Sequence, residues 1–307
     1  MKALIAGGTG FIGQFLIPAL LKDNHQVVVL GRDTNKIQKT FHDKVTALTW
    51  DTLSSESLRD VDAIINLAGT NIGEKRWSTS VKDSVKTSRF NTTKKLVDCC
   101  LSLNEKKPRM LNASAIGIYG LHEHQPQQPQ PVDESWEIPW GKPTDFSSEI
   151  TQAWENTLQP AIDHGMHVAK MRFGVVLHPK FGALKKLMPS IKLGMASVIG
   201  NGKQGVSWIM IDDLIRAILF LLEHPEISGP INCTSPNPIS QKTFIKALAR
   251  AAHRPCFLKT PAWVIKFLFG QMGDELIIKG QRVIPTKLLE HGFKFRYETI
   301  DGVGFEK

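Results

Sequence analysis

The sequence predicts an α/β protein with a Rossmann-type, doubly wound parallel sheet and a smaller C-terminal substrate lobe. Three observations predict this class. A short apolar segment at residues 2–6 leads directly into a glycine-rich turn and then a helix. Strand-like and helix-like segments alternate from residue 1 to about residue 120. Beyond them, residues 181–214 are apolar and punctuated by glycine, as expected for pocket loops at the carboxyl edge of such a sheet.

We therefore expect residues 1–177 to form the cofactor domain, with some later segments returning to it. Residues 178–307 would form the substrate lobe and a C-terminal module. The segment 240–253 predicts an amphipathic helix opened by Ser240. Residues 122–134, rich in Pro and Gln, predict an exposed loop beside the substrate cleft.

Composition excludes several classes of protein. The chain has 307 residues, of which 42% are apolar and 22% charged, as in ordinary soluble domains. The first 21 residues superficially resemble a signal peptide, but glycines interrupt them and no cleavage motif follows. No stretch of 18 apolar residues predicts a membrane span. Four cysteines without a CxxC pattern indicate reduced thiols in a cytoplasmic protein. The net charge of +9 is spread along helix faces, which argues against a nucleic-acid partner.

The glycine-rich turn predicts a dinucleotide site. Glycines spaced as Gly7-x-x-Gly10-x-x-Gly13 allow a sharp turn and a close approach of backbone to pyrophosphate, and the helix N-terminus offers free N–H groups. A lone glycine motif is weak evidence, but here the strand before it and the helix after it supply the context. The turn residues that we expect to hold the cofactor are Gly7, Thr9, Gly10, Phe11, Ile12 and Gly13.

The next strands predict which nucleotide is bound. The strand at residues 26–32 is followed by Asp33, and Arg32 stands where a guanidinium suits a 2′-phosphate. Alternatively, Arg32 is a surface charge and Asp33 takes the ribose hydroxyl of NAD. We favour NADP over NAD. A third strand ends at Asp51, within reach of the adenine, and a fourth strand ends at Leu67, Ala68 and Gly69, which would lie beside the cofactor.

A set of ordered motifs resembles the extended short-chain dehydrogenase/reductase superfamily, and more closely its atypical epimerase-like branch. The matching segments are GGTGFIG (7–13), NLAG (66–69), KRW (75–77), SRFNTT (88–93), SAIGIYG (114–120), RFGVVL (172–177), GNGKQGVSWIMIDDL (200–214) and GQRVIPTKLLEHGFKF (280–295). They span almost the whole chain, including the small C-terminal module typical of that branch. As a set they are specific, although each segment alone is not.

The resemblance implies roles for further residues. Arg89 would contact the nucleotide from its helix, unless it lies on a solvated helix face. Val176 would pack near the nicotinamide, and Leu67 and Ala68 would contact the cofactor through their backbone. Ser114 occupies the strand end where the superfamily keeps Ser or Thr, and its hydroxyl can bond a substrate carbonyl or alcohol. The alternative for Ser114 is an ordinary serine at the end of a strand.

The usual acid/base pair of the superfamily, Tyr-x-x-x-Lys followed by a glutamate, is absent. Aligning that glutamate on Glu155 places Ser147, or Phe146 with one residue of slack, at the tyrosine position. Thr151 or Ile150 then replaces the lysine. None of these side chains is a phenol or an ammonium group. We therefore expect Phe146, Ser147, Ile150 or Thr151 to line the cleft beside the nicotinamide.

Tyr119 is the nearest phenol, but no lysine accompanies it at helical spacing, and an unaided phenol with a pKa near 10 is a poor proton shuttle at neutral pH. It is either a packing residue or a catalytic one. Met210 stands where the family often has a histidine. Other acid/base candidates are Glu134, Glu149, Asp212 and Asp213, although at least one of this last pair is expected to cap the helix that follows it.

Two functions of different classes remain open. One is an NADP-dependent oxidoreductase or epimerase that acts on an alcohol or carbonyl, such as a nucleotide sugar, using Ser114 or Tyr119. The other is a cofactor-binding sensor or regulator without turnover, as some relatives labelled cell-division inhibitors suggest. We expect a small-molecule partner, a monomer or homodimer, no membrane partner and no metal, because His122 and His124 are only two candidate ligands on a loop.

Overall fold

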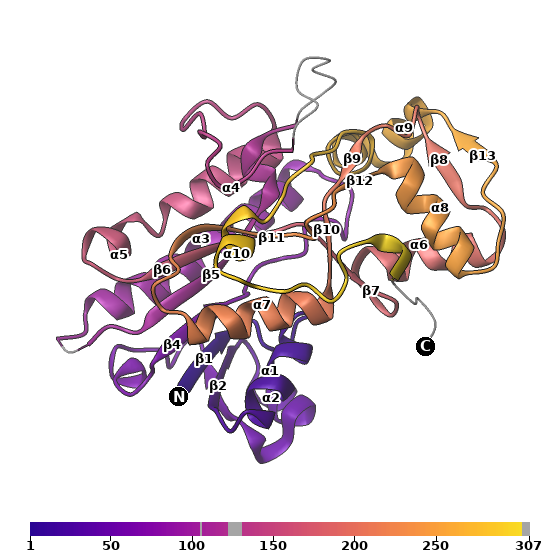
Figure 1. Ribbon diagram of the computed structural model, residues 1–307. Coiled ribbons are helices and arrows are strands. Elements are labelled where there is room, and N and C mark those ends of the chain that lie inside the picture. The colour runs from indigo at the N-terminus through magenta and orange to yellow at the C-terminus, as the bar shows by residue number, and fades with distance from the viewer. Residues whose placement is uncertain (105, 122–130, 303–307) are drawn as a thin grey trace.

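A seven-stranded parallel sheet forms the centre of the protein (Figure 1). The computed structural model describes residues 1–104, 106–121 and 131–302. From one edge to the other the strands are β3 (Thr46–Thr49), β2 (Gln26–Gly31), β1 (Lys2–Ala6), β4 (Ala63–Asn66), β5 (Arg109–Ala115), β6 (Val168–Phe173) and β11 (Gly229–Cys233). The strand order reverses between β1 and β4, which creates the switch point where doubly wound sheets bind ligands. The predicted fold class is confirmed.

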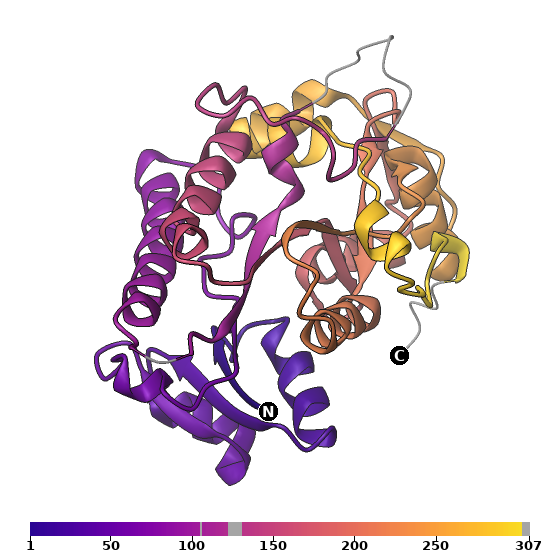
Figure 2. The same ribbon diagram turned by 60° about the vertical axis from the view of Figure 1, so that its left-hand side comes forward.

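Helices cover both faces of the sheet (Figure 2). One face packs against α1 (Gly13–Lys22), α2 (Thr34–Phe41) and α7 (Ile211–Glu223). The other packs against α3 (Thr79–Leu101) and α5 (Gln159–Asp163), and α4 (Phe146–Asn156) packs beside α3. Because both faces are covered, the side chains of Ala3, Leu4, Ile5 and Ala6 are all fully buried, and the strand reads as a continuous apolar run.

A second lobe has a hydrophobic core of its own, built around Trp208 and the apolar faces of two helices. Its elements are β7 (Val175–His178), α6 (Gly182–Lys192), β8 (Ser197–Ile199), β9 (Gly205–Val206), β10 (Trp208–Met210), β12 (Ile239–Ser240), α8 (Gln241–Ala251) and β13 (Leu258–Thr260). The strands pair only two by two, β10 with β7, β12 with β9 and β13 with β8. The lobe follows β6, so it extends from the carboxyl edge of the sheet.

The C-terminal segment crosses back from the lobe to the sheet. It contains α9 (Ala262–Gly273), a π-helical turn (Asp274–Ile278), α10 (Thr286–Glu290) and a final 3-10 turn (Ile300–Gly302). Leu288, Phe293 and Phe295 join the core that lies under α1 and α7. Further 3-10 turns occur at His42–Lys44, Glu56–Leu58 and Ile116–Tyr119. Among the described residues, no helix combines the length and apolar character needed to cross a membrane.

Helix starts follow the polar residues that the sequence offers. Asp145 caps α4 by accepting a hydrogen bond from the amide of Ser148 at 2.8 Å, and Ser240 caps α8 by accepting one from Thr243 at 3.1 Å. The helix start at Ser240 was predicted. The expectation that Asp212 or Asp213 caps a helix was wrong, because α7 already begins at Ile211 and has no side-chain cap. Asp213 is instead buried, where it accepts hydrogen bonds from the amides of Arg296 and Tyr297.

Candidate functional site

The glycine turn lies at the carboxyl end of β1, and its backbone packs closely against the start of α1. Gly7 has a φ of +76°, and the amide of Gly10 donates to its carbonyl at 2.9 Å. A Cβ on Gly13 would lie 2.2 Å from the carbonyl oxygen of Gly8, so only glycine lets α1 begin this close to the turn. No side chain caps α1 among the described residues. The amides of Gln14 and Phe15 already donate to the carbonyls of Gly10 and Ile12, so the amides of Phe11, Ile12 and Gly13 and the positive helix dipole are what this end of α1 offers a phosphate.

The remaining turn residues face inward or support the turn. The carbonyl of Thr9 accepts a hydrogen bond from the side chain of Gln14 at 3.0 Å, which fixes the loop against α1. Ile12 immediately precedes the helix and packs against the core. Phe11 stacks on Phe181, with ring centroids 5.2 Å apart and an interplanar angle of 1°. The predicted turn residues thus form one compact structure.

Phe11 also connects the turn to the lobe. An added Cβ at Gly182, the first residue of α6, would lie 3.3 Å from the Phe11 ring and 3.4 Å from the carbonyl oxygen of Val176. The Phe11 ring and the carbonyl of Val176 therefore both lie within contact distance of the same point beside Gly182. The structure brings Val176 to the glycine turn, as expected for a residue beside the cofactor path.

At the end of β2, Arg32 and Asp33 have different environments. Asp33 caps α2 by accepting a hydrogen bond from the amide of Lys36 at 3.2 Å, which uses its carboxylate locally. Arg32 is exposed, and it forms no hydrogen bond or ion pair with any described residue. The guanidinium is therefore free to bind an anion at the switch-point edge of the sheet. Asp51 is exposed in the turn after β3, which ends at Thr49, two residues earlier than predicted.

The loop after β4 is in direct contact with the glycine turn. A Cβ on Gly7 would lie 2.9 Å from the carbonyl oxygen of Leu67 and from the amide nitrogen of Ala68. The side-chain oxygen of Asn66, fully buried, accepts a hydrogen bond from the amide of Ala68 at 3.2 Å and so fixes this loop. Leu67 and Ala68 consequently lie where backbone contact with a nucleotide is expected.

Arg89 lies against the same loop from α3. Its Nη1 donates to the carbonyls of Thr70 at 2.9 Å and Val85 at 3.1 Å, and its guanidinium lies 5.0 Å from the ring centroid of Trp154. A Cβ on Gly69 would lie 3.4 Å from Arg89. Burial lowers the pKa of Arg89 to about 10. A solvated helix face is therefore excluded for Arg89, whereas its contact with the nucleotide stays a prediction.

Ser114 belongs to a buried polar network. Its hydroxyl donates to Glu155 Oε1 at 2.6 Å, and Arg172 donates to both oxygens of Glu155 at 2.9 and 3.0 Å. Lys170 Nζ lies 3.6 Å from Glu155 Oε2. Ser114, Glu155 and Arg172 are each no more than 3% exposed. Because the carboxylate accepts the proton of Ser114, the serine oxygen has only lone pairs left to offer a ligand.

Tyr119 continues this network. Its hydroxyl donates to Asn232 Oδ1 at 2.8 Å and accepts a hydrogen bond from Arg172 Nη1 at 2.9 Å. Burial raises the pKa of Tyr119 to about 12, despite the neighbouring Arg172. The phenol is thus strongly held in its protonated form and its proton is bound to Asn232. These contacts favour packing over catalysis for Tyr119, and its catalytic role stays untested.

The first turn of α4, where the acid/base tyrosine of the superfamily would stand, carries an unexpected carboxylate. Glu275 Oε2 accepts hydrogen bonds from the amide and hydroxyl of Ser147 at 3.0 and 2.8 Å. Glu275 Oε1 accepts from the amide of Phe146 at 3.3 Å and from Gln271 Nε2 at 2.7 Å. The Glu275 carboxylate thereby occupies the positive end of α4. The acidic residues in the apolar run GDELII were the one available sequence signal for it.

The other residues of this turn have separate environments. Phe146 and Ile150 pack with Val85 against α3, and Thr151 donates its hydroxyl to the carbonyl of Ser147 at 2.7 Å. All four predicted residues, 146, 147, 150 and 151, are at most 7% exposed. Of these four side chains, Ser147 lies against the turn after β5, since a Cβ on Gly117 would lie 3.2 Å from the Cβ of Ser147.

The remaining acidic candidates bind elsewhere. Glu134 accepts hydrogen bonds from the amides of Asn232 at 2.7 Å and Lys287 at 3.3 Å, and burial raises its pKa. Glu149 pairs with Lys86 on the surface at 2.5 Å. Met210 is buried in the core of the lobe. His122 and His124, together with most of the predicted loop 122–134, lie outside the described residues.

The fold and these contacts define a Rossmann-type nucleotide-binding fold, with a candidate site at the switch point of the sheet. A sequence profile of the NAD dependent epimerase/dehydratase family matches residues 3–233, and one for a domain of unknown function, DUF1731, matches residues 260–303. The chain belongs to the NAD dependent epimerase/dehydratase family and carries this C-terminal module. The resemblance seen in the sequence motifs is confirmed.

Relatives match along almost the whole chain. An epimerase family protein of Mycobacterium leprae, ML0860, is 35% identical over 296 residues, covering 96% of this chain and 92% of the relative. Epimerase family protein YfhF of Bacillus subtilis is 34% identical over 303 residues, covering 98% and 96%. The crystal structure of human epimerase family protein SDR39U1 with NADPH superposes with a TM-score of 0.85 at 26% identity, covering 98% and 97%.

Proposed function

We propose that this protein binds NADP(H) at the switch point, with the 2′-phosphate on Arg32 and the pyrophosphate on the glycine turn. The observation that carries the proposal is the contrast between the free guanidinium of Arg32 and the carboxylate of Asp33, which caps α2. A ribose hydroxyl needs an acceptor such as Asp33, whereas a 2′-phosphate needs a cation. The NADPH bound to the human relative supports the same choice.

The glycine turn fits this cofactor for a steric reason. The space beside Gly7 and Gly13 would be filled by a Cβ, so the backbone alone forms the cradle. When bound, NADP(H) donates or accepts a hydride. Arg89, Leu67 and Ala68 would hold the nucleotide beside the loop after β4, and Val176 would pack toward the nicotinamide.

Calorimetric titration tests the cofactor choice. Wild type should bind NADP more tightly than NAD, and Arg32→Ala should lose about tenfold in NADP affinity with little change for NAD. Asp33→Asn, which keeps an N-capping side chain, is the matched control and should preserve the preference. Equal affinities for the two cofactors in wild type would refute the proposal.

For the chemistry, we infer an oxidoreductase or epimerase reaction on an alcohol or carbonyl, with a nucleotide sugar as one possible substrate class. Family membership supports this inference. Ser114 would position the substrate by accepting a hydrogen bond from a substrate hydroxyl, because its own proton is bound to Glu155. No phenol–lysine pair supports proton transfer at α4, so the proton donor must come from another group.

A second candidate is a sensor or regulator that binds NADP(H) without turnover. One observation favours it. The hydroxyl protons of Ser114, Tyr119 and Ser147 are all bound to buried side-chain oxygens, so none of these three hydroxyls is free to donate a proton to a substrate. A panel of alcohols, carbonyls and nucleotide sugars, followed at the nicotinamide absorbance, separates the two functions. Turnover that Ser114→Ala abolishes while NADP affinity is unchanged supports the enzyme, and cofactor binding without any turnover supports the sensor.

A further inference from the structure

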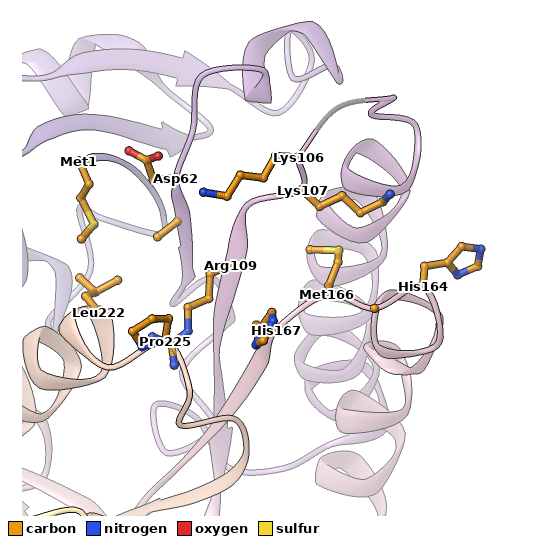
Figure 3. Close-up of a pocket in the computed structure, with 12 residues that line it drawn as sticks. Met1, Asp62, Lys106, Lys107, Arg109, His164, Met166, His167, Leu222 and Pro225 are labelled. Atoms are coloured by element: carbon orange, nitrogen blue, oxygen red, sulfur yellow. The ribbon is translucent and has the colours of Figure 1, made fainter.

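A cavity of about 590 Å³ opens at the amino edge of the sheet, the edge opposite the glycine turn (Figure 3). Its walls come from the starts of β1 and β4, the segments leading into β5 and β6, and the end of α7. The volume is in the range of small-molecule sites, roughly 300–1,000 Å³. The nucleotide site lies at the carboxyl ends of the same strands, so the two sites are separated by the length of the sheet.

One part of the cavity is apolar. The side chains of Met1, Ala63, Met166 and Leu222 contribute to it, and Pro225 closes it beside the end of α7. Met166 and Leu222 are buried in the protein core on their other sides. This surface would cover the apolar body of a ligand, and the removal of both apolar surfaces from water would favour binding.

The rest of the cavity is rich in cations. Lys106, Lys107 and Arg109 line it from one short segment, and the lining contains one carboxylate, that of Asp62. Asp62 already accepts a hydrogen bond from the amide of Lys2 at 2.8 Å. Within the described chain, none of the three cations forms an ion pair. The positive charge of the cavity is therefore not balanced by its own lining.

Arg109 contributes charge to the cavity, and two of its five N–H groups are already bonded. Its two Nη atoms donate to the carbonyls of Leu221 and Ile227 at the end of α7, and its Nε is buried without a partner. Burial lowers the pKa of Arg109, and the exposed Glu226 opposes this effect. The lysines, which form no ion pair in the described chain, would supply most of the direct contacts to a ligand.

Figure 3 shows how these side chains are arranged. Lys106 extends toward Asp62, above Arg109 and His167, whereas Lys107 extends in the other direction, toward His164. His164 Nδ1 lies 2.8 Å from the carbonyl oxygen of Pro160 and must donate to it, so that its Nε2 is left for a ligand or water. The inner cationic group therefore consists of Lys106 and Arg109, with His167 beside them.

We propose that this cavity is a second ligand site, for a small molecule that carries a phosphate group on an apolar body. The apolar wall suits the body and the unpaired lysines suit a dianion. A monoanion would leave more of the positive charge unbalanced. The volume of the cavity fits one small molecule rather than a polymer.

The test uses phenyl phosphate as the probe, titrated by calorimetry into wild-type protein saturated with NADP, so that neither Arg32 nor the glycine turn is left to capture the phosphate. One saturable site is expected. Phenylacetate, with a single negative charge, and benzyl alcohol, with none, should bind at least about tenfold more weakly. Lys106→Ala combined with Lys107→Ala should weaken phenyl phosphate about tenfold, and Lys106→Ala alone should account for the larger part.

The matched control is Lys242→Ala with Lys246→Ala, which removes two exposed lysines from α8 in the lobe and changes the net charge equally. It should leave phenyl phosphate binding unchanged. Circular dichroism and thermal unfolding confirm that both double variants are folded. The proposal is overturned if phenyl phosphate shows no saturable binding, if both double variants weaken it equally, or if phenylacetate binds as tightly.

Discussion

Glu275 and Ser147 are 128 residues apart in the chain, yet the carboxylate of Glu275 accepts hydrogen bonds from both the amide and the hydroxyl of Ser147. The contact joins the C-terminal module to the first turn of α4. In this chain, the place of the superfamily's acid/base tyrosine is therefore held by a helix start that is capped by a carboxylate from another part of the fold. Both side chains are buried, at 5% and 7% exposure.

Removing the Glu275 carboxylate should destabilise the protein. Glu275→Ala leaves the amides of Phe146 and Ser147 without acceptors in a buried place, and we expect a loss of about 3 kcal/mol in the free energy of unfolding. Urea unfolding measures it. Glu298→Ala, which removes an exposed carboxylate from the same C-terminal module, should change stability by less than about 0.5 kcal/mol. Equal effects of the two substitutions would contradict a capping role for Glu275.

Restoring the missing residue types at α4 should not restore proton transfer. In Ser147→Tyr with Thr151→Lys, the new ring meets both Glu275 and the backbone at Gly117, where a Cβ would already be 3.2 Å from that of Ser147. We expect overpacking to cost about 1–3 kcal/mol, with no gain in turnover. Asn156→Tyr, at an exposed position at the end of α4, is the control for adding a ring. A stable double variant with new carbonyl-reductase activity would disprove this reading of the site.

The fold was predictable because its signals are local. The buried strand at residues 2–6, the glycine spacing and the cap at Ser240 each depend on neighbours within a few residues. The polar network was not predictable in the same way. Ser114 and Glu155 are 41 residues apart, and Ser147 and Glu275 are 128 apart, so no periodicity reports that they meet. The sequence pointed to Ser114 and to the missing pair at α4. Only the three-dimensional structure shows that Glu155 accepts the proton of Ser114 and that Glu275 accepts the proton of Ser147.

Tyr119 should titrate far above neutral pH. Its pKa is raised to about 12, first of all by burial, so the folded state retains the phenol proton between pH 10 and 12 while the unfolded state loses it. The stabilisation is complete below pH 10 and is lost as the pH rises toward 12, by about 2–3 kcal/mol in total. The chain has two tyrosines, so phenolate absorbance in Tyr297→Phe reports Tyr119 alone.

Two comparisons make this titration decisive. Tyr119→Phe should flatten the fall in stability between pH 10 and 12, because the phenol that causes it is gone. Tyr119→Phe should also cost about 1–2 kcal/mol at pH 7, since Asn232 and Arg172 each lose a partner. A midpoint near pH 10 in folded Tyr297→Phe would show that Tyr119 is not buried in the way that raises its pKa.

The close approach at Gly7 gives a prediction in which steric contact and backbone strain can be separated. Gly7 has a φ of +76° and Gly165 one of +77°, so alanine at either position meets the same unfavourable backbone conformation, at a cost of about 1–2 kcal/mol. The surroundings differ. A Cβ at Gly7 would lie 2.9 Å from Leu67 and Ala68, whereas a Cβ at Gly165 would have nothing within 4 Å. We expect Gly7→Ala to push the loop after β4 away from the turn and to lower NADP affinity by more than about tenfold, measured by calorimetry. Gly165→Ala should lose similar stability from strain alone and keep NADP affinity. If both variants bind NADP as wild type does, the contact between the glycine turn and the loop at Leu67 does not shape the nucleotide site.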